Sequence, residues 1–187
     1  MQKVVFTGGP SSGKTTTLNM VSNMRPELSI IPEQATLVIK EELAKQSADP
    51  DYQLKVPWTD YTAFNEVNVA RMVQAEAAIP DDAGTVLLDR SIVDAVGYLH
   101  VHGLSAGSGP TVKRARAAGY DLALYFESIS EFEETEVRRD KDLTEDIGRE
   151  VLRAFEENGI DIVHVKLDTE ENRAKFIIAE LAVRGLL

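Results

Sequence analysis

The 187-residue chain contains no cysteine. Disulfide bonds, thiolate zinc sites and a thiol nucleophile are therefore excluded, and the composition fits a reducing compartment. Cationic residues are also scarce, because 20 lysines and arginines stand against 31 aspartates and glutamates and leave a formal net charge of −11. This negative charge disfavours binding of DNA or RNA through extended electrostatic contact with the phosphates. Any anion that the protein binds must therefore be held by a local site.

Long hydrophobic runs are absent as well. No stretch approaches the roughly 20 apolar residues that span a bilayer, and Met1 to Lys3 lead at once into a short strand-like run rather than a secretion signal. We therefore expect a soluble cytoplasmic protein that binds neither membranes nor nucleic acid. The length fits one domain, 1–187, and 43% hydrophobic residues suffice for a normal core.

Short apolar runs alternate with helical patterns along the chain. Five runs have the length and composition of buried strands: 4–6, 28–31, 85–88, 122–126 and 160–165. Apolar residues recur at helical spacing in three stretches: 63–77, 143–155 and 174–181. This alternation predicts an α/β fold, with a five-stranded parallel sheet and helices on both faces.

A glycine-rich segment directly follows the first expected strand. Residues 8–15 match the phosphate-binding pattern G-x-x-x-x-G-K-[ST] at every fixed position, and a helical stretch follows near Lys14. Strand, loop and helix thus occur in the order that this site requires. The residues expected to bind a nucleotide are Gly8, Gly9, Pro10, Ser11, Ser12, Gly13, Lys14, Thr15 and Thr16.

Each fixed position of this loop has a chemical reason. Gly8 and Gly13 allow the dihedrals and the close approach with which successive backbone N–H groups surround phosphate oxygens. The start of the helix adds partial positive charge, Lys14 reaches the β and γ phosphates, and the Thr15 hydroxyl is placed to bind Mg²⁺. The sequence predicts a site for ATP and Mg²⁺; the alternative is a Gly/Ser-rich turn with an exposed lysine.

An acidic residue ends the apolar run at 85–88. Asp89 is the candidate for holding Mg²⁺, and its alternative role is that of a residue at the start of a helix. Arg90 follows where a cation could meet a transferring phosphate, although a surface ion pair is an equal alternative. Ser91 and Asp94 have the spacing of a capping box, and we expect them to be mainly structural.

With these motifs the chain resembles the P-loop small-molecule kinases, and more closely the NadR-like AAA-type ATP-binding family, which includes ribosylnicotinamide kinase domains. The resemblance rests on residues 7–15, 31–33, 87–90 and 136–140, which are spread over most of the chain. It implies a three-layer P-loop NTPase fold. It also implies an ATP-dependent phosphotransferase that acts on a hydroxyl of a small metabolite, such as a nucleoside or a ribosylated base.

The resemblance implies roles for individual residues too. Glu33 would be the general base that orients or deprotonates the acceptor hydroxyl. Asp89 would hold Mg²⁺ through water, and Arg90 would correspond to the arginine that follows this acidic residue in nucleoside kinases. Arg138 and Arg139 are similar to lid arginines, which close over the nucleotide and neutralise charge on the transferring phosphate.

The acceptor should lie across the crevice from the nucleotide, at the carboxyl ends of the strands. This places it near Glu33, three aromatic residues and a glycine-bearing flap: Trp58, Tyr61, Phe64 and 102–110. The aromatic rings could stack on a base, or they could be helix-packing residues. His100 and His102 have no third ligand nearby, so we expect them to be structural or solvent-facing rather than metal-binding.

A second function stays open from the sequence. The charged segment at 127–142, expected to form the lid, could instead order around a γ-phosphate and present an acidic surface to a protein partner. The chain would then be an ATP- or GTP-binding switch without a small-molecule acceptor. The absence of an N-K-x-D guanine signature favours ATP, and the sequence does not decide between a monomer and a homodimer.

Overall fold

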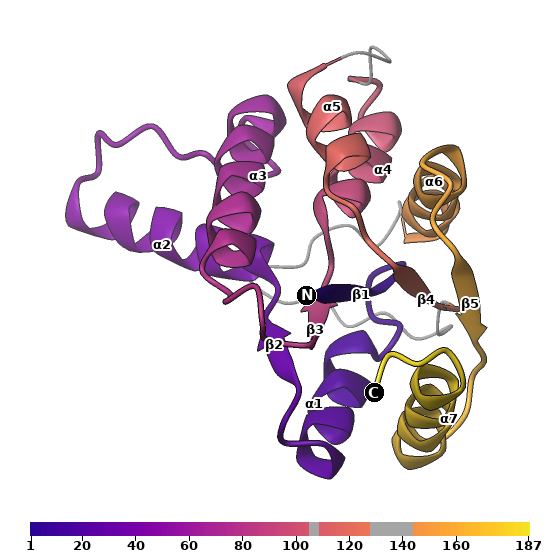
Figure 1. Cartoon of the computed structure of the whole chain (residues 1–187). Coiled ribbons are helices and arrows are strands. Elements are labelled where there is room, and N and C mark those ends of the chain that lie inside the picture. The colour runs from indigo at the N-terminus through magenta and orange to yellow at the C-terminus, as the bar shows by residue number, and fades with distance from the viewer. Residues whose placement is uncertain (105–108, 128–143) are drawn as a thin grey trace.

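Five parallel strands form one sheet in the computed structural model, which describes residues 1–104, 109–127 and 144–187 (Figure 1). The strands are β1 (Gln2–Gly8), β2 (Ser29–Ile31), β3 (Thr85–Asp89), β4 (Leu122–Phe126) and β5 (Ile162–Val165). Their order across the sheet is β2-β3-β1-β4-β5, and all neighbouring pairs are parallel. The predicted α/β sheet is confirmed, with each strand within a few residues of its expected position.

Helices cover both faces of this sheet (Figure 1). They are α1 (Lys14–Met24), α2 (Gln34–Ala48), α3 (Tyr61–Ala77), α4 (Ile92–Val101), α5 (Pro110–Ala117), α6 (Thr144–Glu157) and α7 (Glu170–Val183). One hydrophobic core lies between the sheet and the helices α3 to α6, and a second lies between the sheet and the pair α1 and α7. The result is the expected three-layer arrangement.

Successive residues of a strand point to opposite faces of the sheet, so their side chains enter the two cores alternately. Val5 and Leu88 belong to the core under α3 to α6. Val4, Phe6 and Leu87 belong to the core under α1 and α7. Because helices cover both faces of the central strands, these strands are continuous apolar runs in the sequence.

The sheet creates a crevice where neighbouring strands lead to helices on opposite faces. β1 continues into α1 on one face, whereas β3 continues into α4 on the other. Phe6 lies opposite Asp89 in the register, so Gly8 and Asp89 emerge at the same edge of the sheet. Ligands of open parallel sheets bind in such a crevice. The fold therefore brings the two strongest sequence motifs together.

Two helices, α2 and α5, have no counterpart among the predicted helices. α2 follows β2 almost at once and continues to Ala48, and an irregular segment then leads to α3. Asp60 caps α3 by accepting a hydrogen bond from the Ala63 N–H at 2.9 Å. α2 and α3 pack together around a third, smaller apolar cluster. Within the described ranges, no helix has the length and apolar character needed to cross a bilayer.

Candidate active site

The loop between β1 and α1 has the backbone shape that its glycines allow. Gly8 has φ +130°, and Gly13, the residue before α1, has φ +78°. A Cβ atom on Gly8 would lie 2.4 Å from the carbonyl oxygen of Phe126 in β4. A side chain at Gly8 would therefore clash with the neighbouring strand, and at Gly13 it would face an unfavourable left-handed conformation. The sequence pattern fixes glycine at both positions for these reasons.

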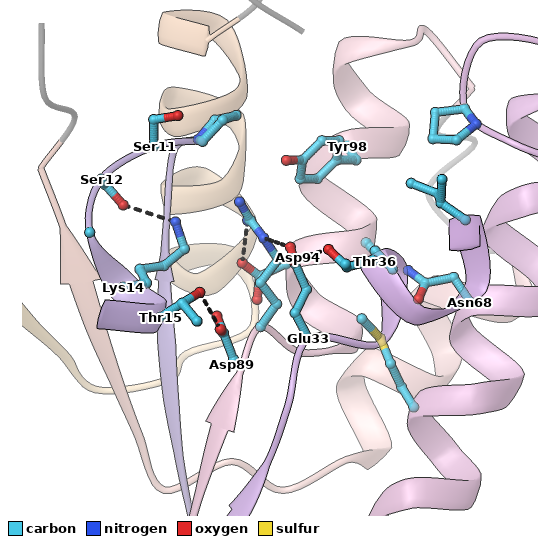
Figure 2. A pocket seen from close by; sticks show the side chains of 18 of the residues that line it. Ser11, Ser12, Lys14, Thr15, Glu33, Thr36, Asn68, Asp89, Asp94 and Tyr98 are labelled. Atoms are coloured by element: carbon cyan, nitrogen blue, oxygen red, sulfur yellow. Dashed lines mark hydrogen bonds and ion pairs between the residues drawn. The ribbon is translucent and has the colours of Figure 1, made fainter. Parts of the chain in front are cut away.

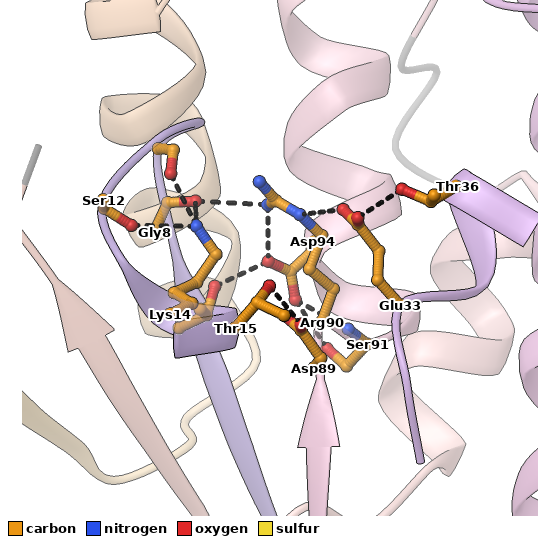
Figure 3. A network of polar contacts seen from close by, with 12 residues as sticks. Gly8, Ser12, Lys14, Thr15, Glu33, Thr36, Asp89, Arg90, Ser91 and Asp94 are labelled. Carbon is orange, nitrogen blue, oxygen red and sulfur yellow. Dashed lines mark hydrogen bonds and ion pairs between the residues drawn. The ribbon is translucent and has the colours of Figure 1, made fainter. Parts of the chain in front are cut away.

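Lys14 is buried and turned onto the loop itself (Figure 3). Its Nζ donates hydrogen bonds to the Gly9 carbonyl at 2.6 Å and to the Ser12 hydroxyl at 2.8 Å. Burial, and after it the positive charge of Arg90, lower the pKa of Lys14 to about 7. Bound phosphate oxygens would take the place of these uncharged acceptors and favour the charged ammonium.

Thr15 and Asp89 meet across the crevice, as expected for a magnesium site. The Thr15 hydroxyl donates to Asp89 Oδ2 at 2.6 Å. Burial, and after it the negative charge of Glu33, raise the pKa of Asp89 above its usual range. A hydroxyl and a carboxylate are hard oxygen donors that suit Mg²⁺. No cluster of three or more histidine, aspartate or glutamate side chains that could hold a metal ion occurs in the described part of the chain.

Arg90 forms a buried ion-pair network rather than the surface ion pair that the sequence allowed (Figure 3). Its Nε donates to Glu33 Oε1 at 3.0 Å, and its terminal NH1 lies 3.3 Å from Asp94 Oδ1. The same NH1 donates to the Gly8 carbonyl at 3.1 Å. Arg90 also has φ +69°, a left-handed conformation that is unusual for a residue with a side chain and is often found at functional sites.

Asp94 connects the start of α4 to this network. Its Oδ2 accepts hydrogen bonds from the backbone N–H and the hydroxyl of Ser91, which confirms the predicted capping box. Its Oδ1 accepts a further hydrogen bond from the Thr7 hydroxyl at 2.7 Å, in addition to the contact with Arg90. Asp94 therefore holds β1, Arg90 and α4 in one arrangement, a role that the sequence motif alone did not reveal.

Glu33 follows β2 and comes just before α2. Its two carboxylate oxygens accept from different donors, Oε1 from Arg90 and Oε2 from the Thr36 hydroxyl at 2.6 Å. The side chain keeps 21% of its surface exposed. Glu33 is thus held in a defined orientation on the wall of a pocket while remaining accessible.

This pocket has a volume of about 470 Å³, in the range of small-molecule sites. Figure 2 shows Glu33 and Asp94 between the phosphate-binding loop on one side and Thr36, Tyr98 and Asn68 on the other. We call this second side the acceptor arm. It is formed by Thr36, Ile39, Pro57, Tyr61, Phe64, Asn68, Met72, Ala95, Tyr98 and His102.

Aromatic rings and one amide characterise the acceptor arm. The rings of Tyr61 and His102 stack with their centroids 3.8 Å apart, so His102 contributes to the pocket although it is exposed. Phe64 is buried at the pocket wall, whereas Trp58 packs into the third apolar cluster and does not line the pocket. Asn68 extends from α3 into the pocket (Figure 2), and its buried Oδ1 has no hydrogen-bond partner among the residues that the structure describes.

Several predicted residues lie outside the described ranges. These are Arg138, Arg139, nearly all of the segment 127–142 and the centre of the flap at 102–110. Their predicted roles stay predictions. Conversely, α7 contributes two pocket residues that the sequence analysis missed, Glu170 and Arg173. No sequence pattern links them to the loop, because only the packing of α7 beside α1 brings them near it.

Comparison with known protein families agrees with this geometry. A family model described as an AAA domain matches residues 3–173. The chain belongs to this AAA domain family. The matched segment contains the phosphate-binding loop, Glu33, Asp89 and Arg90. No curated protein sequence shows a significant match to the chain.

Solved structures of P-loop kinases share the fold of this AAA domain. Thymidylate kinase from Candida albicans is 16% identical with a TM-score of 0.69, over 99% of this chain and 92% of that one. A NadR protein in complex with NR is 18% identical with a TM-score of 0.72, over 97% of this chain but only 50% of that one. Deoxyadenosine kinase from M. mycoides is 11% identical with a TM-score of 0.64, over 97% and 99% of the two chains. These similarities confirm the predicted P-loop kinase fold.

Proposed function

We propose that this AAA domain is a kinase that transfers the γ-phosphoryl group of ATP to a hydroxyl of a small uncharged acceptor, a nucleoside or a ribosylated base. The observation that carries the proposal is the position of Glu33. Its carboxylate stands between the phosphate-binding loop and the acceptor arm, oriented by Arg90 and Thr36. A hydrolase could use such a carboxylate to activate water, but it would not need the aromatic acceptor arm that Glu33 also faces.

The loop side of the pocket would bind the triphosphate. Backbone N–H groups at the start of α1 surround the phosphates, and Lys14 exchanges its contacts with the loop for contacts with phosphate oxygens. Thr15 and Asp89 would hold Mg²⁺, which when bound neutralises charge on the phosphate oxygens. Phosphoryl transfer needs mainly such positioning and charge stabilisation from the protein.

Glu33 would accept the proton of the acceptor hydroxyl as its oxygen attacks the γ-phosphorus. The two hydrogen bonds that Glu33 accepts fix the direction of its carboxylate. The guanidinium of Arg90 places a positive charge 3.0 Å from this carboxylate. Because Arg90 already contacts Glu33, Asp94 and the Gly8 carbonyl, we assign it the role of a positioning residue for Glu33.

The charge of the acceptor arm supports an uncharged acceptor. Among the described residues that line the pocket, the lysine and arginine side chains are Lys14, Arg90 and Arg173. Lys14 and Arg173 contact the loop, and Arg90 is paired with Glu33 and Asp94. A phosphate monoester carries nearly two negative charges at neutral pH. It would face Glu33 without a lysine or arginine of the acceptor arm to pair with.

The shape of the acceptor arm supports a planar ring. Phe64, Tyr98 and the stacked pair of Tyr61 and His102 offer flat apolar surfaces on which a base can lie. The unpartnered Oδ1 of Asn68 would accept a hydrogen bond from an N–H group at the edge of that ring. Bases with an amino or a carboxamide group therefore fit best.

Acceptor-dependent formation of ADP tests this function. The protein is incubated with MgATP and a panel of nucleosides, including bases with amino and carboxamide groups, together with their 5′-monophosphates. We expect ADP formation with at least one nucleoside and a kcat/KM about tenfold or more lower for its monophosphate, the effect of one unpaired charge. Preference for monophosphates, or no acceptor across the panel, would contradict the proposal.

The role of Glu33 is tested by Glu33→Gln. Loss of the base should lower kcat about 10²- to 10⁴-fold, while the affinity for MgATP stays within about twofold. The matched control is Glu41→Gln, which removes an exposed carboxylate from α2 far from the network. Unchanged turnover in Glu33→Gln would remove the main support for a hydroxyl acceptor.

A further inference from the structure

Arg173 lies directly against the phosphate-binding loop, although 161 residues separate it from Ser12 in the sequence. It belongs to the first turn of α7, and only 6% of its surface is exposed. Its NH1 donates a hydrogen bond to the Ser12 carbonyl at 3.0 Å. The contact ties the last described helix to the first loop of the chain.

This hydrogen bond fixes the orientation of one peptide unit in the loop. The Ser12 carbonyl and the Gly13 N–H belong to the same peptide, and in a trans peptide these two groups point in opposite directions. The described residues contain no cis peptide bond. With the carbonyl held toward the Arg173 guanidinium, the Gly13 N–H points away from that group, and we infer that it is available to a phosphate bound in the loop.

The guanidinium group also packs tightly on Gly13. A Cβ atom at Gly13 would lie 2.7 Å from NH2 and 2.9 Å from NH1 of Arg173. Position 13 therefore requires glycine for two reasons: the backbone there is left-handed, and the arginine leaves no room for a side chain. The first requirement follows from the backbone shape of the loop, whereas the second follows from the packing of α7 against it.

Arg173 is a buried cation that no carboxylate of the described residues contacts within 4 Å. Hydrogen bonds from Asn172 and the Thr169 N–H, and after them the more distant charge of Arg173, lower the pKa of the exposed Asp168. The Nε of Arg173 has no hydrogen-bond partner among the described residues, and its guanidinium lies 5.7 Å from the ring centroid of Phe126. Arg90, by contrast, is paired with two carboxylates. Buried charges are normally compensated, and in a protein of net charge −11 the missing partner is readily explained by a bound anion.

We propose that Arg173 is a positioning residue of the nucleotide site. It fixes the Ser12–Gly13 peptide of the loop and adds a second positive charge, besides Lys14, to the pocket beside that loop. The proposal rests on the nucleotide binding proposed above but not on the transfer to an acceptor. By this proposal α7 is one of the elements that bind the nucleotide. The anion that compensates the charge of Arg173 is then the polyphosphate tail.

Calorimetric titration with MgADP tests this role without turnover. The unaltered protein is compared with Arg173→Met, Arg173→Lys and the control Lys175→Met, which removes an exposed positive charge from the same helix. We expect Arg173→Met to weaken binding about tenfold or more, the effect of losing one charge-assisted hydrogen bond. Arg173→Lys should recover most of this loss, and Lys175→Met should stay within about twofold.

The melting temperature of the empty variants separates positioning from packing. Removal of an uncompensated buried charge should leave the Tm of Arg173→Met within about 2 °C of the unaltered protein or above it, while its MgADP affinity falls. If Arg173→Met does not fold, Arg173→Gln replaces it as the uncharged variant, because its amide can still face the Ser12 carbonyl.

Three results would overturn the proposal. In the first, the uncharged variant binds MgADP as tightly as the unaltered protein. In the second, Arg173→Lys is no better than the uncharged variant and both lose stability when empty, which indicates a packing role. In the third, the unaltered protein takes up no MgADP, and the proposed nucleotide site fails with it. Tight MgADP binding without any phosphorylated acceptor would instead contradict only the proposed transfer.

Discussion

At the scale of single residues, the pocket is defined by how its three buried cations are compensated. Arg90 is paired with carboxylates, whereas in the described part of the chain the hydrogen bonds of Lys14 and Arg173 go to uncharged acceptors. These two cations both touch the phosphate-binding loop. A bound polyphosphate would therefore bring negative charge into direct contact with them, which the described carboxylates supply only from a greater distance.

The lowered pKa of Lys14 predicts how nucleotide affinity depends on pH. The pKa is about 7 in the empty site, and phosphates raise it because they favour the charged ammonium. Below pH 7 the lysine is already charged, so its contribution to affinity is constant. Above pH 7 binding must take up a proton, and the affinity for MgADP should fall by up to about tenfold per pH unit.

Calorimetry in buffers of different ionisation enthalpy measures this proton uptake directly. We expect uptake to rise toward about one proton per bound MgADP between pH 7 and pH 9, where the nucleotide phosphates no longer titrate. Binding at pH 8 without proton uptake would show that Lys14 is already charged in the empty protein. Lys14→Ala should show neither tight binding nor uptake.

The sequence predicted the loop side of the site far better than the acceptor arm. Gly8 to Thr15 form a contiguous motif whose chemistry is local, and Asp89 directly follows a buried strand. Asn68 and Arg173 lie on helices, where a single polar residue looks like any other solvent-facing position. Only tertiary packing places them in the pocket, so no local pattern could have identified them.

At the scale of elements, α4 connects the site to the packing of the helical layer. Its first turn carries Ser91 and Asp94, which hold the polar network, and its middle packs closely on α6. Gly97 makes this close packing possible. A Cβ atom at Gly97 would lie 2.6 Å from the Cα of Val151.

Gly97→Ala should therefore destabilise the protein, although alanine is the better helix former by about 1 kcal/mol. The added methyl group must push the α6 backbone away, and overpacking of this kind lowers the free energy of unfolding by about 1–3 kcal/mol. Urea unfolding measures the change. Gly109→Ala is the control, because a Cβ at Gly109 would meet no atom within 4 Å. Equal stability of the two variants would contradict the close packing of α4 on α6.

The elements themselves differ in how well the sequence predicted them. The three central strands, β1, β3 and β4, were found because both of their faces are buried. α2 was missed because its buried face is interrupted by Glu42, which is 1% exposed and accepts hydrogen bonds from Tyr52, Lys45 and the backbone of Lys55. A charged residue in the middle of an apolar stripe hides the helical period. α5 spans only Pro110–Ala117 and buries few apolar residues.

At the scale of the whole molecule, the nucleotide site joins elements from both helical layers. Its residues come from the ends of β1 and β3, from α1 and α7 on one face, and from α4 on the other. A ligand that contacts all of them should stabilise the fold as a unit rather than one segment.

Thermal unfolding should report this coupling. MgADP at about 100 times its Kd contributes about 2.7 kcal/mol, which corresponds to a rise in Tm of roughly 5–10 °C for a domain of this size. Lys14→Ala should show little of this rise. A shift of the same size in Lys14→Ala would mean that the nucleotide binds elsewhere on the protein.

The contact of α7 with the loop also has a consequence for synthesis on the ribosome. Arg173 is synthesised 161 residues after Ser12 and follows every described strand. If ATP binds as proposed, its complete site forms only after α7 has docked on the loop. Bound ATP would then stabilise mainly those chains that have already assembled their sheet.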